Sequence, residues 1–175
     1  GAATAAAATA TNIAAAVLCS LRTMVHRKNG PMTVVASDAG TGGGGPGADG
    51  GGLLPAAHHS GSPTFENLNS LATTLLTEND VAMQRTGAEM AGTLCWFATE
   101  EGVMANIHRL EALSQSDNPC ARAGSALALG SMCRALGAMK SVPYLSSIVG
   151  LLCVLAREIE MPVRVWVLHS LWLTV

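Results

Sequence analysis

The chain has 175 residues, of which 49% are hydrophobic, 13% charged and 3% aromatic. Because its apolar residues are mainly Ala, Leu, Val and Met, the composition favours packed helices over sheets. The formal net charge of -2 excludes the strongly basic balance of nucleic-acid-binding domains. We therefore expect no nucleic-acid partner.

The first 30 residues are rich in alanine, and apolar residues recur there at helical spacing between about residues 12 and 28. One helix is expected over that range, with Asn12 as its N-cap. The segment has neither the basic start nor the strongly apolar middle of a signal peptide. Gly1 and Val175 suggest a piece cut from a longer protein, because the chain starts without Met and stops within an apolar segment.

Residues 31–63 are rich in Gly, Ser and Pro, and four glycines stand in a row at 42–45. This composition predicts a flexible linker or loop insertion. His58 and His59 lie in it without further ligands at useful spacing, and the glycine run lacks the Lys-Ser/Thr ending of a phosphate loop. We expect no metal and no cofactor.

From residue 64 onward the sequence repeats. Three segments align without gaps, at 83–92, 121–130 and 163–172, with offsets of 38 and 42 residues between their last positions. Each follows a polar or proline-bearing turn and an earlier apolar helix, expected at 65–76, 102–114 and 143–156. A helix-turn-helix unit of about 40 residues is the period of HEAT and armadillo repeats.

The predicted fold is therefore all-α, an alpha-solenoid of antiparallel helix pairs with HEAT/armadillo-like repeats. The repeats are expected at 64–98, 102–136 and 143–175, the last one truncated. Gly87, Gly92, Gly124 and Gly130 lie on the second helices of the first two units. Since mid-helix glycine costs roughly 1 kcal/mol relative to alanine, these glycines indicate close helix packing.

The turn before the second aligned segment has the HEAT pattern most fully, with Asp117, Pro119 and Arg122. In that pattern Asp117 caps the second helix and Arg122 bridges to a neighbouring repeat. Val163 and Arg164 keep part of the pattern in the third unit, with Pro162 displaced by one residue.

The five cysteines stand singly, mostly in or beside apolar helical runs. We expect reduced, buried or partly buried thiols and a cytosolic location. The longest apolar run, 142–156, ends at Arg157 and is too short for a bilayer, which needs roughly 18 residues.

Three runs of sequence, 84–92, 121–134 and 163–171, resemble the central part of the HEAT repeat-containing protein 5 family. The pattern R-x-G-x-x-L-A-L-G-x-x-x-R occupies 122–134, and V-x-x-W-x-L-H-S-L occupies 163–171. The resemblance covers residues 64–175. Trp172 departs from it, since a small residue is more usual there.

The resemblance implies a large cytosolic solenoid that works with the clathrin adaptor complex at the trans-Golgi network and endosomes. Accessory partners of that family are aftiphilin and gamma-synergin, and it contributes no catalytic residues. Membrane association would be indirect, through the partners. The HEAT pattern alone also fits nuclear transport receptors and phosphatase scaffolds.

Two function classes follow, a protein-binding scaffold and an enzyme. An enzyme would need a nucleophile and a base within reach, and the candidate bases are few. His108 and His169 lie in helical segments, and His169 lies near Trp166 and Trp172, where a packed imidazole is the commoner state, so we expect no enzyme and no catalytic residue. A scaffold would bind an extended or acidic peptide through polar residues on the second helices. These candidate partner-binding residues are Gln84, Arg85, Glu89, Arg122, Ser125, Arg134 and Arg164.

For Arg122 and Arg164 the alternative, which the HEAT pattern favours, is that they tie one repeat to the next. The last segment, 163–175, carries apolar residues in nearly every direction around a helix. We therefore expect it to expose a stacking face. Further HEAT repeats of the same parent chain, or self-association, would cover that face.

Overall fold

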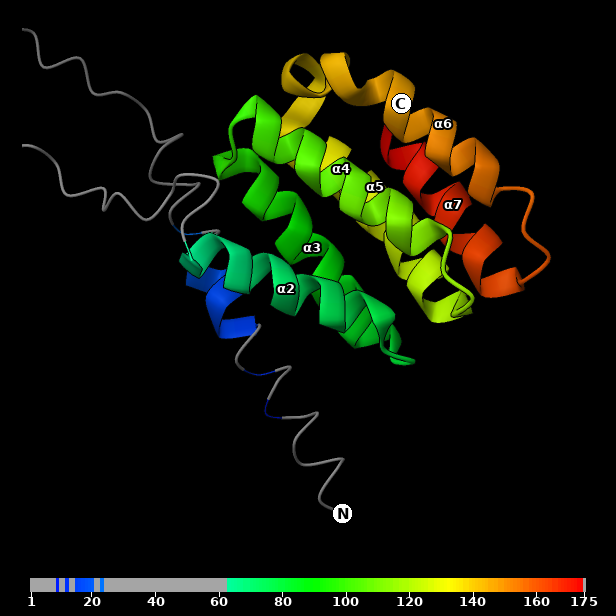
Figure 1. Ribbon diagram of the computed structural model, residues 1–175, viewed down its shortest axis with the longest axis horizontal. Coiled ribbons are helices and arrows are strands. Elements are labelled where there is room, and N and C mark those ends of the chain that lie inside the picture. The colour runs from blue at the N-terminus through cyan, green and yellow to red at the C-terminus, as the bar shows by residue number, and fades with distance from the viewer. Residues whose placement is uncertain (1–8, 10–11, 13–14, 21–22, 24–62, 175) are drawn as a thin grey trace, which may run out of the picture.

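The computed structural model describes residues 9, 12, 15–20, 23 and 63–174, and within them every regular element is helical. The protein is all-α over this part of the chain (Figure 1). The elements are α2 Pro63–Thr77, α3 Val81–Phe97, α4 Glu100–Ser114, α5 Pro119–Ser141, the 3-10 helix η2 Val142–Tyr144, α6 Leu145–Leu155 and α7 Met161–Thr174.

The described residues at 9, 12, 15–20 and 23 are helical, so Asn12 lies within helical structure and the prediction that it is the N-cap is wrong; the rest of that prediction lies outside the described residues. So does the predicted linker up to residue 62. The first helices expected at 65–76, 102–114 and 143–156 correspond to α2, α4 and α6, with η2 forming the start of the last. The three aligned segments lie within α3, α5 and α7.

α5 is the central element, and α3 and α7 are its two most extensive neighbours. Figure 1 shows α4 and α5 in the middle, with α2 and α3 to one side and α6 and α7 to the other. Short turns connect α2 to α3 and α6 to α7, and the helices of each pair contact one another. These pairs are therefore antiparallel hairpins of helices.

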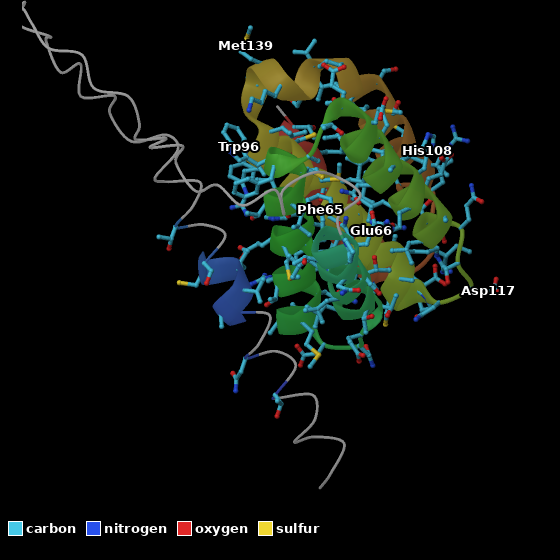
Figure 2. All side chains as sticks on the ribbon, turned by 60° about the vertical axis from the view of Figure 1, so that its left-hand side comes forward. Phe65, Glu66, Trp96, His108, Asp117 and Met139 are labelled. Carbon is cyan, nitrogen blue, oxygen red and sulfur yellow. The ribbon has the colours of Figure 1, made fainter. Side chains whose placement is uncertain are left out.

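The cap of α5 differs from the prediction. Asn118, not Asp117, is the N-cap, and its side-chain oxygen accepts a hydrogen bond from the Cys120 backbone N–H at 2.9 Å. Asp117 is exposed and stands out from the loop before α5 (Figure 2). Asn118 takes the role because it directly precedes Pro119, the first helical residue.

The glycines on α3 and α5 permit close helix contacts, as predicted. A Cβ at Gly92 would lie 2.6 Å from the Ser131 carbonyl oxygen, and one at Gly130 would lie 2.6 Å from the Ser170 side chain. Gly124 lies against the Leu76 backbone in the same way. Real Cβ atoms do not approach other atoms so closely, so α5 contacts its neighbours almost backbone to backbone.

These contacts enclose most of α5. From residue 121 to 133 all its residues are buried except Arg122, which is half-buried. The helix bends at Gly137, whose φ of 72° is the left-handed conformation that glycine adopts readily.

By length and composition alone, the helical stretch Pro119–Leu155 could cross a membrane. It is longer than the 142–156 run considered from sequence because α5 continues into η2 and α6. One such stretch is weak evidence, because core helices of soluble proteins pass the same test.

Candidate partner-binding surface

Two of the predicted partner-binding residues lie inside the protein. The Gln84 side-chain amide donates to the Glu78 carbonyl at 2.9 Å and to the Cys120 carbonyl at 3.3 Å. Ser125 is fully buried, and its hydroxyl donates to the Arg122 carbonyl at 2.8 Å. Both side chains satisfy backbone groups and are not accessible to a partner.

Arg122 is also engaged inside the protein, with 12% of its side chain exposed. Its guanidinium donates to the Ser116 carbonyl at 2.7 Å and lies 2.9 Å from the Glu160 carboxylate. Its Nε lies 3.4 Å from Glu158 Oε2 but outside hydrogen-bond geometry. Arg122 therefore ties α5 to the loop before α7, which is the bridging role that the HEAT pattern predicts for it.

The remaining four predicted residues reach the surface. Arg85, Arg134 and Arg164 are exposed, and Glu89 is half-buried. Arg134 Nη2 on α5 lies 3.7 Å from Glu89 Oε1 on α3. Because Glu89 is one helical turn from Arg85, Arg85, Glu89 and Arg134 form one patch across α3 and α5.

This patch continues onto α7 through an aromatic contact. The Arg85 guanidinium carbon lies 5.2 Å from the centroid of the Trp166 ring, a cation-π distance. His169 follows Trp166 on α7, with ring centroids 5.8 Å apart, and Trp172 lies 6.4 Å beyond His169. We call the whole set of residues, Arg85, Glu89, Arg134, Trp166, His169 and Trp172, the arginine-tryptophan surface.

The three aromatic members were missing from the predicted binding residues. A signal for them exists in the aligned segments, where Trp166 and Trp172 stand at the positions of Gly124 and Gly130. Arg164 is exposed on α7 and forms no ion pair among the described residues. The alternative for Arg164 was that it ties one repeat to the next, and no ion pair of this kind is present in this part of the chain.

A second feature is a hollow of about 440 Å³ between the end of α3, the start of α4 and η2. Trp96, Lys140 and Tyr144 line it, and the Lys140 ammonium lies 3.6 Å from the Trp96 ring centroid. The Trp96 indole N–H is buried and has no hydrogen-bond partner. Figure 2 shows Trp96 and Met139 on the same side of the molecule.

The buried thiols are poor nucleophiles. Burial raises the pKa of the Cys95 thiol to about 12 and that of Cys133 to about 11. The prediction of buried or partly buried thiols is correct for these two and for Cys120, but wrong for Cys19 and Cys153, which are exposed. Both lie on helix faces that no other described element covers.

The described histidines form no catalytic pair with a nucleophile. His108 Nδ1 lies 3.3 Å from Glu111 Oε2 on the exposed face of α4, and His169 lies between two tryptophans. Within residues that the structure describes, no group of three or more His, Cys, Asp or Glu side chains could hold a metal ion.

No family model matches this chain, and neither a curated protein nor a solved structure matches it.

Proposed function

We propose that this protein is a non-catalytic protein-binding scaffold, built as an alpha-solenoid of antiparallel helix pairs of the HEAT type. The observation that carries the proposal is the arginine-tryptophan surface. It joins side chains of α3, α5 and α7 into one exposed patch through the Arg85–Trp166 and Glu89–Arg134 contacts. Arginine and tryptophan are the residues most enriched among those that dominate binding energy at protein interfaces.

The helix order supports the solenoid part of the proposal. The helices α3, α5 and α7 begin equivalently, with backbone N–H groups of residues 84, 122 and 164 donating to the carbonyls of Asp80, Asn118 and Glu160. They are preceded in turn by α2, α4 and α6, and α5 contacts both α3 and α7. Successive neighbours of this kind are the contact pattern of stacked repeats.

The chemistry of the surface suits an acidic peptide segment. Arg85 and Arg134 are exposed, and a guanidinium donates two parallel hydrogen bonds to a carboxylate. Trp166 beside Arg85, and Trp172 farther along α7, offer flat apolar area to the same segment. For the partner we propose the clathrin adaptor complex and its accessory proteins, with a cytoplasmic location at the trans-Golgi network and endosomes, on the resemblance of residues 64–175 alone.

The experiment is affinity capture from cytosol with the chain as bait, comparing the wild type with an Arg85→Ala/Arg134→Ala variant. We expect clathrin-adaptor components in the wild-type capture and several-fold less with the variant. Arg157→Ala is the matched control, because Arg157 is an exposed arginine outside the surface. Circular dichroism verifies that helicity is unchanged.

Two results would revise the proposal. Capture of nuclear-transport cargo or of phosphatase subunits would replace the trafficking assignment by one of the other HEAT scaffolds. Equal capture by the wild type and the double variant would remove the arginine-tryptophan surface from the binding site.

A further inference from the structure

An exposed apolar stripe runs along α7, made of Met161, Val165, Leu168 and Trp172, which we call the α7 stripe. These side chains are 62%, 51%, 68% and 75% exposed, respectively. At 3.6 residues per turn, spacings of four, three and four residues place them within about 60° of the helix circumference. The opposite face of α7 is buried against α5 and α6.

Alternating spacings of three and four residues are those of a coiled-coil seam, in which one helix packs against one other helix. The helices of membrane-surface segments have a broader apolar face and several cations on the polar face. α7 has a narrow stripe, and Arg164 is its only arginine or lysine. The stripe therefore fits a helix better than a lipid surface.

The charges beside the stripe indicate what kind of helix fits. Arg164 directly precedes Val165 and places a positive charge on one side of the seam, and His169 directly follows Leu168 on the other side. α7 contains no acidic residue. Flanking positions in coiled coils select partners of opposite charge, so acidic residues should flank the seam of the partner.

A second copy of this chain satisfies that charge condition poorly. α7 contains no acidic residue, so a second α7 offers Arg164 no carboxylate in either orientation. An acidic partner helix offers one.

Another helix could not pack on this face through the near-backbone contacts that α5 makes with α3 and α7. Gly92 and Gly130 permit the near-backbone contacts between successive helices. Trp172 stands at the aligned position on α7, and its side chain is 75% exposed. A helix on this face must therefore lie farther away, at the 8 to 10 Å separation of packed side chains.

We propose that the α7 stripe docks an amphipathic helix of a partner protein, whose apolar seam of three- and four-residue spacing is flanked by glutamates or aspartates. This goes beyond the proposed function: Trp172 belongs to both surfaces, but docking on the stripe uses Met161, Val165 and Leu168 and does not depend on Arg85 or Arg134. The two proposals can therefore fail separately.

The test uses the full chain and two synthetic helical peptides of about three heptads, with leucines in the seam. One peptide has glutamate at the flanking positions and the other has lysine. Fluorescence anisotropy measures binding of each labelled peptide. We expect the glutamate peptide to bind at least about tenfold more tightly than the lysine peptide, a difference of about 1.4 kcal/mol.

Leu168→Glu should weaken binding of the glutamate peptide by about tenfold or more. Met139→Glu is the matched control, because Met139 is 87% exposed on α5 and lies outside the stripe; it should leave binding unchanged. Arg164→Glu should reverse the preference between the two peptides. Since Arg164 is exposed, this charge reversal tests the proposal without disturbing the core.

Four results would overturn the proposal. The first two are that neither peptide binds to the wild type and that both peptides bind equally tightly. The third is that the chain sediments as a dimer and that Leu168→Glu dissociates this dimer, which makes a second copy the occupant. The fourth is that the chain binds vesicles containing phosphatidylserine, that Leu168→Glu abolishes this binding, and that the glutamate peptide does not compete with it, which makes a lipid surface the occupant.

We expect Arg85→Ala/Arg134→Ala to leave peptide binding unchanged. That result separates this site from Arg85 and Arg134 of the arginine-tryptophan surface.

Discussion

Arg85 on α3 and Trp166 on α7 meet over α5, with the guanidinium carbon 5.2 Å from the ring centroid. The contact spans three helices because the middle one carries small residues, among them Gly124 and Ser125. A helix with small side chains lets its neighbours approach one another above it. The face of α5 that carries Gly124 and Ser125 is therefore covered and not accessible to a partner.

The Arg85–Trp166 contact should be measurable as a coupling energy. We expect a double-mutant cycle with Arg85→Ala and Trp166→Ala to give about 0.5 to 1 kcal/mol of favourable coupling in the free energy of unfolding. Urea denaturation of the four proteins supplies the values. A cycle of Arg85→Ala with Trp96→Ala is the control, and we expect no coupling there, because Trp96 is packed with Lys140. Additive effects in both cycles would show that the cation-π contact contributes nothing.

The surroundings of two glycines predict that replacement by alanine changes the free energy of unfolding in opposite directions. Gly92→Ala should lower the free energy of unfolding by about 1 to 3 kcal/mol, because the new Cβ overlaps the backbone of Ser131. Gly150→Ala should raise it by about 0.5 to 1 kcal/mol, because that exposed helical glycine faces open space. Thermal or urea denaturation measures both. Similar changes at the two sites would contradict the close approach of α3 and α5.

The Glu160 carboxylate predicts a loss of stability in acid. Its pKa lies below the ordinary value of 4.5, first because of a hydrogen bond with its own backbone and then because of the Arg122 guanidinium. A lowered folded-state pKa stabilises the protein above the unfolded-state value, and that stability is lost as the pH falls through the folded-state pKa. The wild type should therefore be more stable than Glu160→Gln at pH 7, and the difference should shrink below pH 4.5. Urea denaturation of both proteins across this range is the measurement, and a constant difference would count against the ion pair.

The thiols should divide into two reactivity classes. Cys95 and Cys133 are buried, with the pKa raised to about 12 and about 11, so little thiolate forms at pH 8. Cys153 is exposed on α6. We expect maleimide to label Cys153 within minutes and the two buried thiols only after unfolding in denaturant, as read by mass spectrometry of peptides. Rapid labelling of Cys95 in the native protein would show that α3 opens readily.

The sequence predicted the helices from their period, and it predicted the bridging role of Arg122 and the contacts of Gly92 and Gly130 from residue type. It did not predict which polar side chains on the second helices face water. Period specifies which face of a helix packs, but the exposure of Gln84 and Ser125 depends on how closely the helices approach. The cap at Asn118 was missed because two adjacent residues, Asp117 and Asn118, are equally able to accept the backbone hydrogen bond.

α5 contacts α2, α3, α4, α6 and α7, so no helix pair forms an independent layer of this structure. Stacked repeats commonly unravel from their ends, one unit at a time, because each unit contacts only its neighbours. Here the loss of α6 and α7 would expose the same helix that α2 and α3 require for their own burial. Residues 63–174 should therefore unfold as one cooperative unit, so the slowest-exchanging amides of α3, α5 and α7 should report the same free energy of opening in hydrogen exchange.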